Sequence, residues 1–212
     1  MTIVPLYDWA MSVKGTTAVA DIAEFGTRAQ DIIDEYLAGV SPAISAKNAF
    51  VRLVDDTMTE LAEQAWADGG RDMDDLPVDA LMQVLSAQRD FARAAFDKLV
   101  AQVAELPAGS AYMSEIGIGL GDRWAAGAWG VYNEFKMRAK TNTKALYFWT
   151  LGATEKHCGT CLELAGGRGH TMDWYLARDY IPGKNGCSLE CGGWQCDCTL
   201  TDAAGHDWTL SA

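Results

Sequence analysis

Hydrophobic residues recur every three or four positions along most of the first 140 or so residues, a spacing that gathers them on one face of a helix. Gly39, the pair Gly69-Gly70 and Pro107 interrupt the pattern, and Ser41-Pro42 has the form of a helix start. The pattern predicts helices over residues 8–37, 42–68, 77–106 and 122–140. We therefore expect an N-terminal helical bundle whose core is made by these apolar faces.

Two segments of the same region depart from the helical pattern. Residues 1–7 are apolar but contain Pro5, which favours an extended arm. Residues 110–121 contain several glycines that weaken a helix, and their alternation of Ile and Gly indicates a bent or extended piece. No Gly-Lys-Ser/Thr follows these glycines, so the segment does not have the form of a phosphate-binding loop.

The pattern changes after Thr143. Residues 146–149 are predicted to form a strand, and glycine-rich turn signals recur from there to Gly193. Residues 171–180 are predicted to form a short helix, with Thr171 as its cap. The last part of the chain is therefore expected to be a small, loop-rich region unlike the helical part.

The net charge of −12, from 29 acidic and 17 basic residues, argues against a protein that grips phosphate backbones. The first 13 residues lack the basic start of a signal peptide. No run approaches the roughly 18 apolar residues of a membrane span. We expect a protein made in a reducing cytoplasm, where clustered cysteines favour metal over disulfides, and no contact with a membrane.

One local basic stretch stands against this acidic background. It falls within nine residues at the end of the last predicted helix and consists of Lys136, Arg138, Lys140 and Lys144. Cations at a helix C-terminus interact favourably with the helix dipole, which is one possible role for these residues. The alternative role is a contact with an acidic partner surface or with nucleic acid.

All six cysteines lie between Cys158 and Cys198, in the order Cys-x-x-Cys, a gap of 25 residues, then Cys-x3-Cys-x4-Cys-x-Cys. Two intervening residues allow Cys158 and Cys161 to point at one ion, and tetrahedral Zn²⁺ commonly takes two such pairs. We expect the second pair to be Cys196 and Cys198. Cys191 or Cys187 could replace either member of this second pair, and His170 is a further alternate ligand. A structural Zn²⁺ would also supply folding free energy to a region with little core.

The helical periodicity and the cysteine spacing together predict a mainly α fold with two parts. Residues 1–143 are expected to form a helical domain with an N-terminal arm. Residues 144–201 are expected to form a small Cys-rich, zinc-ribbon-like α+β module with short antiparallel strands. Residues 202–212 are expected to be a tail. The arm and the tail are where we expect contacts with neighbouring subunits.

Two further hypotheses for the six sulfurs stay open. Six is an even number, so all could pair as disulfides under oxidising conditions, or two could pair while four bind metal. A redox site is less consistent with the sequence, because the residues after Cys161 hold four more cysteines and many turns, unlike a thioredoxin. No His-Glu-x-x-His, Gly-x-Ser-x-Gly or kinase signature is present, so we expect a protein that is not an enzyme.

The stretch from Trp149 to Gly166 resembles the C-terminal module of phage head morphogenesis proteins, the minor head proteins similar to protein F of phage Mu. That family has a Trp-containing strand, a polar turn, Cys-x-x-Cys, a proline stretch and a Cys-x-Cys pair before a final strand. Here Ile181-Pro182 and Cys196-Asp-Cys198-Thr-Leu200 fill the last places. The helix at residues 123–136 also resembles the one that precedes the family's module, and the resemblance covers about residues 120–201.

The chain departs from the family just before its Cys-x-Cys pair. Many members have His-Pro-x-Cys-x-Cys, where this chain has Cys191-Gly-Gly-Trp-Gln-Cys196-Asp-Cys198. Cys191 either stands in for that His or belongs to a loop with another role.

The resemblance implies a virion structural protein: a minor head component of a tailed phage that acts in head assembly, near the portal or inner capsid. Its implied partners are other virion proteins, namely the portal, major capsid or neck protein, in a multimeric arrangement. Its implied location is the head or head-tail junction, after synthesis in the host cytoplasm. One alternative is a zinc module that contacts packaged DNA through the basic stretch. A second is a redox or metal-dependent enzyme.

Overall fold

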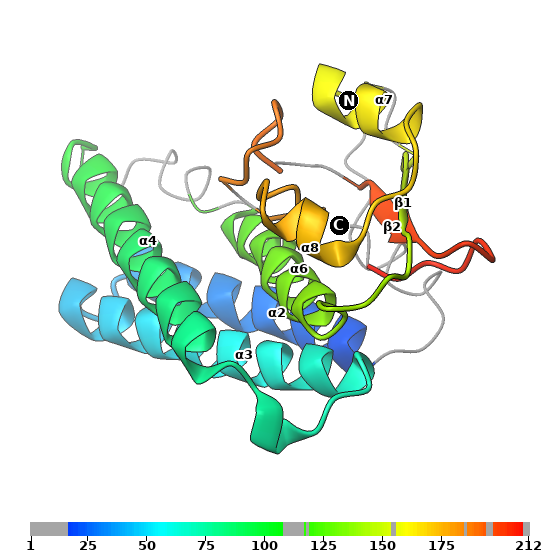
Figure 1. Ribbon diagram of the computed structural model, residues 1–212. Coiled ribbons are helices and arrows are strands. Elements are labelled where there is room, and N and C mark those ends of the chain that lie inside the picture. Colours follow the sequence, from blue (N-terminus) through cyan, green and yellow to red (C-terminus); the bar gives the residue numbers. More distant parts are fainter. Residues whose placement is uncertain are drawn as a thin grey trace. The chain divides into compact units, whose positions relative to one another are not determined.

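The computed structural model (Figure 1) describes residues 17–107, 117, 119–153, 156–184, 186–193 and 197–209. Over these residues the protein is mainly helical, with one small two-stranded antiparallel sheet. The chain divides into two compact units, one made of residues 1–60 and 77–125 and the other of residues 61–76 and 126–212. None of the helices within the described ranges combines the length and the apolar character that a membrane crossing requires.

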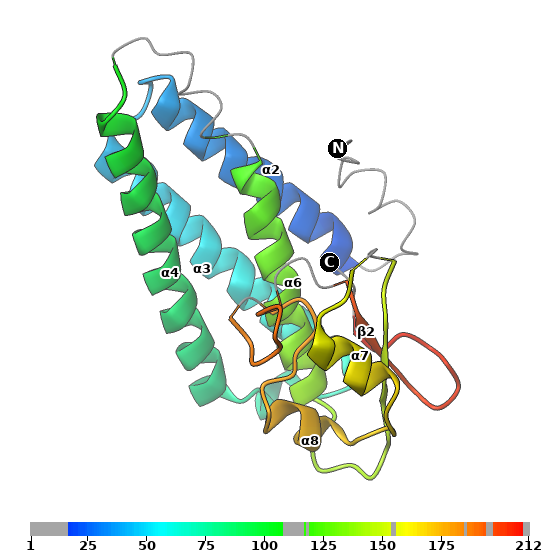
Figure 2. The same cartoon turned by 90° about the horizontal axis from the view of Figure 1, so that it is seen from above.

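The first unit contains α2 (Thr17–Leu37), most of α3 (Ala43–Asp68), α4 (Val78–Ala104) and the start of α6 (Leu120–Arg138). Its buried side chains follow the predicted periodicity and include Ile22, Phe25, Ala29, Ile33, Phe50, Leu53, Leu85, Phe96 and Leu99. Phe50 packs against Phe96, with ring centroids 5.7 Å apart, where α3 and α4 run side by side (Figure 2). The predicted helices are thus confirmed from residue 17 onward. The arm at residues 1–7 and the predicted helix start at Asp8 lie outside the described residues.

Helices α2 and α3 end where the sequence pattern places glycine. Gly39 and Gly70 adopt left-handed conformations, with φ of 72° and 77°. Such conformations cost a side chain with a Cβ more than they cost glycine. After α2, the Val40 N–H donates to the carbonyl of Glu35 at 2.9 Å, which satisfies one of the last carbonyls of the helix.

The glycine-rich segment before α6 is described only at Gly117 and from Gly119 onward. Gln30 of α2 holds both ends of this piece: its Nε2 donates to the Gly117 carbonyl at 2.9 Å, and its Oε1 accepts from the Gly121 N–H at 3.1 Å. Helix α6 begins at Leu120, two residues earlier than predicted. Residues 110–116 and Ile118, predicted to be bent or extended, lie outside the described residues.

The second unit holds the small sheet. Strand β1 (Phe148–Thr150) pairs antiparallel with β2 (Thr199–Thr201), and between them in the chain lie α7 (Gly159–Ala165) and α8 (Met172–Leu176). The short 3₁₀ helix η1 (Met73–Asp75) also belongs to this unit. The core contains Met137, Tyr147, Trp149, Cys161, Met172, Tyr175, Ile181, Cys187, Leu189, Cys198 and Leu200. Antiparallel short strands in a cysteine-rich region were predicted, and both are present.

Helix α8 confirms the predicted short helix, including its cap. The Thr171 hydroxyl accepts from the Trp174 N–H at 3.4 Å, and the helix starts at the next residue. It ends well before Tyr180 because the chain turns at Asp179, whose φ is 52°. The sequence pattern does not show that turn, since no glycine marks it.

The described part of the predicted tail, residues 202–209, folds back on β2. The Asp202 carboxylate closes the turn by accepting from the backbone N–H groups of Ala204 and His206, at 2.8 and 3.0 Å. The Trp208 N–H then donates to the Leu200 carbonyl at 2.6 Å, and the Thr209 hydroxyl accepts from the Leu200 N–H at 2.7 Å. This segment therefore belongs to the module.

Candidate metal centre

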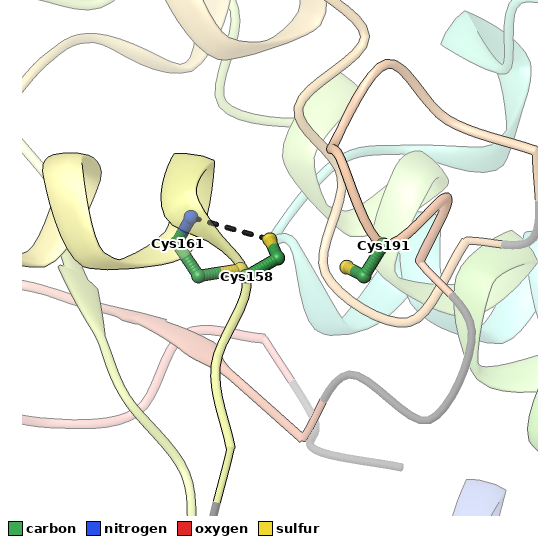
Figure 3. A group of neighbouring side chains, drawn as sticks. All are labelled: Cys158, Cys161 and Cys191. Carbon is green, nitrogen blue, oxygen red and sulfur yellow. Dashed lines mark hydrogen bonds between the residues drawn. The ribbon is translucent and has the colours of Figure 1, made fainter.

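The first two sulfurs lie at the start of α7. Cys158 is the residue that caps this helix, and its sulfur accepts from the Cys161 N–H at 3.5 Å. This turn brings the two side chains of the Cys-x-x-Cys motif together, one buried and one half-buried. Figure 3 shows the two residues on the same turn, with the hydrogen bond between them.

A third sulfur comes from a loop far along the chain. Cys191 points toward Cys158 in Figure 3, and the sulfurs of Cys158, Cys161 and Cys191 all lie within 4.8 Å of one another. Sulfurs bound to one tetrahedral Zn²⁺ at about 2.3 Å are about 3.8 Å apart, whereas the two sulfurs of a disulfide are about 2.0 Å apart. We call these three residues the sulfur group, and its spacing suits a shared metal ion.

The hydrogen bonds within the sulfur group favour the thiolate form of Cys158, which is the form that binds metal. Burial by itself would raise the pKa of Cys158, but hydrogen bonds from the backbone and side chains of Cys161 and Cys191 outweigh it, and the pKa is lowered. The thiolate is the metal ligand, so this shift acts in the right direction. Burial raises the pKa of Cys187, which lies outside the sulfur group in the core of the module.

The loop that carries Cys191 is compact. The Gly186 N–H donates to the Gly192 carbonyl at 2.8 Å, and the Gly192 N–H donates to the Leu189 carbonyl at 2.7 Å. Gly193 has a φ of 73°, and a Cβ on it would lie 1.9 Å from the Lys184 carbonyl oxygen. Residues 186–193 can therefore close this tightly only with glycine at position 193.

A buried ion group anchors the segment that leads into this loop. The carboxylate of Glu134 on α6, whose side chain is 3% exposed, lies 2.6 Å from Arg138 and 3.1 Å from Lys184. Lys184 also pairs with Asp179 at 2.8 Å. Burial would lower the pKa of Lys184, but the two carboxylates raise it above its ordinary value. Two acids and two bases thus balance in one place, where a lone buried charge would be costly.

The neighbouring residue on α6 makes a second attachment to the same segment. The side chain of Asn133 is fully buried, and its Nδ2 donates to the Pro182 carbonyl at 3.0 Å. Residues 179–184 are therefore fixed to α6 by the Lys184–Glu134 ion pair and by a buried hydrogen bond.

The structure brings together two of the four ligands predicted from the sequence, Cys158 and Cys161. Their companion among the described residues is Cys191, which the sequence offered only as an alternate. Cys198 is buried in the same core as Cys161 but is not in the sulfur group, and its sulfur lies 3.7 Å from Nδ1 of His157. Cys196 lies outside the described residues.

The other two alternates are not in the sulfur group. Cys187 is buried in the core of the module. His170 stacks on the indole of Trp174, with ring centroids 3.6 Å apart, and Arg178 lies over the same indole at 4.1 Å. His170 is thus occupied in an aromatic stack.

The basic stretch of the sequence is largely engaged within the protein. Arg138 pairs with Glu134, and the ammonium groups of Lys136 and Lys140 lie 5.3 and 4.8 Å from the centre of the Trp208 ring. Burial lowers the pKa of Lys136, although the charge of Asp68 opposes the shift. These cation–π contacts favour an intramolecular role for the basic stretch.

No protein-family model, curated protein or solved structure matches this chain. Its fold and its site define a mainly helical protein with a small antiparallel sheet and a cluster of three cysteines able to hold a metal ion.

Proposed function

We propose that Cys158, Cys161 and Cys191 bind a structural Zn²⁺ as thiolates and that the cysteine-rich region is a zinc-ribbon-like module. The approach of the three sulfurs to within 4.8 Å carries this proposal. Zn²⁺ in structural sites takes four ligands and favours cysteine thiolates. The Cys196-Asp-Cys198 pair, predicted from the sequence, is the source we assign to the fourth ligand.

The ion would tie together parts of the module that are distant in the chain. The rest of α7, the helix α8 and two loops separate the Cys-x-x-Cys turn from Cys191, and in the described part of the chain the nearby sheet has two strands of three residues each. A structural zinc site contributes on the order of 10 kcal/mol to the folding of small modules. A site closed by four thiolates leaves no position for substrate, so its role is structural.

We further propose that the protein acts by binding, as a minor head component of a tailed phage, with the portal, major capsid or neck protein as partner. What supports this is the order of features it shares with that family: a Trp-containing strand, Cys-x-x-Cys, a Cys-x-Cys pair and a final strand. In the structure Trp149 and Leu200 of these two strands are direct partners. Most of the basic stretch contacts Glu134 or Trp208 within the protein, which favours a protein partner over DNA.

Metal analysis tests the zinc proposal. The full chain, purified under reducing conditions, should contain one zinc ion per chain by mass spectrometry and should give the sulfur-to-metal charge-transfer bands of thiolates when loaded with Co²⁺. Protein without metal, with its sulfurs all in disulfides, would overturn the zinc module.

Co-expression tests the head proposal separately. The chain should co-purify with the portal, major capsid or neck protein encoded in the same genome, or sediment with assembled heads. Absence of association with all three, by a protein that is folded and metal-loaded, would overturn the head role and leave the zinc module standing.

A further inference from the structure

The loop that carries Cys191 is joined to the Cys-x-x-Cys turn by two hydrogen bonds. The carboxylate of Glu190 accepts from the Gly159 N–H at 2.7 Å. In the other direction, the Glu190 N–H donates to the Thr160 hydroxyl at 3.3 Å. Gly159 and Thr160 are the two residues between Cys158 and Cys161, and Glu190 immediately precedes Cys191. The contact therefore links the middle of one ligand pair to the residue beside the third ligand.

From this juxtaposition we propose that Glu190 is a positioning residue for the metal site: it holds Cys191 against the Cys-x-x-Cys turn. The inference rests on the proposed zinc function and identifies a residue outside the ligand set on which metal affinity depends. Neither of the two hydrogen bonds uses a sulfur atom, so both act independently of the ion.

The shape of the turn fits the same role. A Cβ added to Gly159 would lie 2.7 Å from Oε2 of Glu190, so a larger residue here would push the carboxylate away from its present place at the backbone N–H. The Cys-x-x-Cys spacing alone requires no glycine between the ligands. The glycine at position 159 therefore leaves room for the carboxylate that lies over it.

The expected size of the effect follows from the character of the contact. A carboxylate that accepts from a backbone N–H makes a charge-assisted hydrogen bond, stronger than a neutral one. Outer-shell groups that orient metal ligands typically change metal affinity by about 10- to 100-fold when removed. Glu190 and Gly159 are both exposed, which weakens the contact, so we expect a loss near the lower end, about tenfold.

The experiment measures Zn²⁺ and Co²⁺ affinity of the full-length reduced protein by competition with a chromophoric chelator. Glu190→Ala should weaken binding about tenfold. Glu190→Gln should recover part of the affinity, because the amide oxygen still accepts from the Gly159 N–H. Glu163→Ala is the matched control, since it removes an exposed carboxylate from α7, and it should leave the affinity unchanged.

Gly159→Ala separates positioning from stability. The new methyl group should displace the flexible Glu190 carboxylate, while alanine favours the helix that starts there. We expect metal affinity to fall while the thermal stability of the chelator-treated protein stays level or rises. A variant that only damaged the fold would lower both quantities. Thr160→Val, which removes the other hydrogen bond, should show a smaller loss of affinity and gives a second reading if Glu190→Ala does not fold.

Three outcomes would overturn the inference. Wild-type affinity in both Glu190→Ala and Gly159→Ala would show that the contact has no role. An equal loss in Glu163→Ala would show that only net charge matters. Loss of affinity in Glu190→Gln equal to that in Glu190→Ala would show that the accepted hydrogen bond is irrelevant. A wild-type protein that binds neither ion would instead overturn the zinc proposal itself.

Discussion

Trp149 of β1 lies directly opposite Leu200 of β2, and both side chains are buried in the core that also contains Cys161 and Cys198. The strand before the cysteines is thereby paired with the strand that follows them. A sheet of two three-residue strands is marginal by itself. Its stability must therefore come from this shared core and from the ion that we propose beside it.

Trp149→Ala should strongly destabilise the module. The indole is 3% exposed, and its loss removes a large part of the core and leaves a cavity, which costs about 3–5 kcal/mol for a fully buried aromatic side chain. Phe148→Ala is the control on the same strand, since its ring points to the opposite face and is 37% exposed. We expect about 1 kcal/mol or less for that change. Urea unfolding followed by circular dichroism measures both, and equal losses would contradict the assignment of Trp149 to the core.

Cys191→Ser should remove a metal ligand, whereas Cys187→Ser should not. Cys191 is in the sulfur group, and Cys187 is buried outside it. The first change should lower Co²⁺ affinity by more than the ~10–100-fold of outer-shell changes and weaken the charge-transfer band. Retained binding in Cys191→Ser together with lost binding in Cys187→Ser would reverse the assignment. The same titration on Cys196→Ser and Cys198→Ser identifies which member of that pair completes the site.

The helices could be predicted from the sequence because their cause is local. Apolar residues at a helical spacing make the buried faces, and Gly39 and Gly70 end two helices by conformations that few other residues adopt easily. The cap at Thr171 is local in the same sense, because its partner is three residues away. Each of these features is decided within a few residues of the chain.

Local sequence patterns could not predict that Cys191 supplies the third sulfur. Spacing favoured Cys196 and Cys198, but the approach of Cys191 depends on hydrogen bonds between Glu190 and a turn about 30 residues earlier. Such pairings follow from tertiary contacts and leave no periodic signal.

The buried charge on α6 could not be predicted for the same reason. Acidic residues on amphipathic helices are expected on the solvated face, whereas Glu134 is buried with Arg138 and Lys184 as partners. Arg138 lies four residues after Glu134, so the sequence predicts an ion pair between them on one face of the helix. Lys184 comes from a loop 50 residues later, so the sequence carries no local signal for the burial itself.

Glu134→Gln should therefore destabilise the protein by about 2–3 kcal/mol. Breaking a fully buried ion pair costs about 3–5 kcal/mol. The side chains of Arg138 and Lys184 are about one third exposed, so water can solvate them and compensate part of this loss. Glu163→Gln makes the same change in charge on the surface of α7 and should shift the free energy of unfolding by about 0.5 kcal/mol or less. The two should be compared by chemical denaturation, and indistinguishable values would argue against a stabilising ion group.

The full-length protein should not bind duplex DNA, even at low salt. Its net charge is −12, and three of the four residues of the basic stretch contact Glu134 or Trp208. Fluorescence anisotropy with labelled duplex measures the affinity, and a salt series from about 50 mM upward covers the range in which binding through phosphate contacts depends strongly on salt. Binding that weakens with salt and is reduced by Lys144→Gln, which changes the exposed member of the stretch, would favour the nucleic-acid alternative.

Stability should fall in alkaline solution, in part through Tyr175. Burial raises the pKa of this phenol from 10.0 to about 12. Between these values the unfolded chain loses the proton and the folded protein keeps it, so unfolding releases a proton. The contribution of this group is therefore constant below pH 10 and declines by about 1.4 kcal/mol per pH unit up to about pH 12.

Tyr175→Phe isolates this effect. At neutral pH the variant should be less stable by about 1 kcal/mol, because it lacks the hydrogen bond that the hydroxyl donates to the Tyr147 carbonyl at 3.1 Å. Above pH 10 the wild type loses stability because its phenol ionises more easily in the unfolded chain, whereas the variant has no phenol at this position. The difference between their free energies of unfolding should therefore shrink and then reverse. Denaturant unfolding of both proteins from pH 8 to about pH 11 measures it. A difference that stays constant over this range would show that Tyr175 ionises as easily in the folded protein as in the unfolded chain.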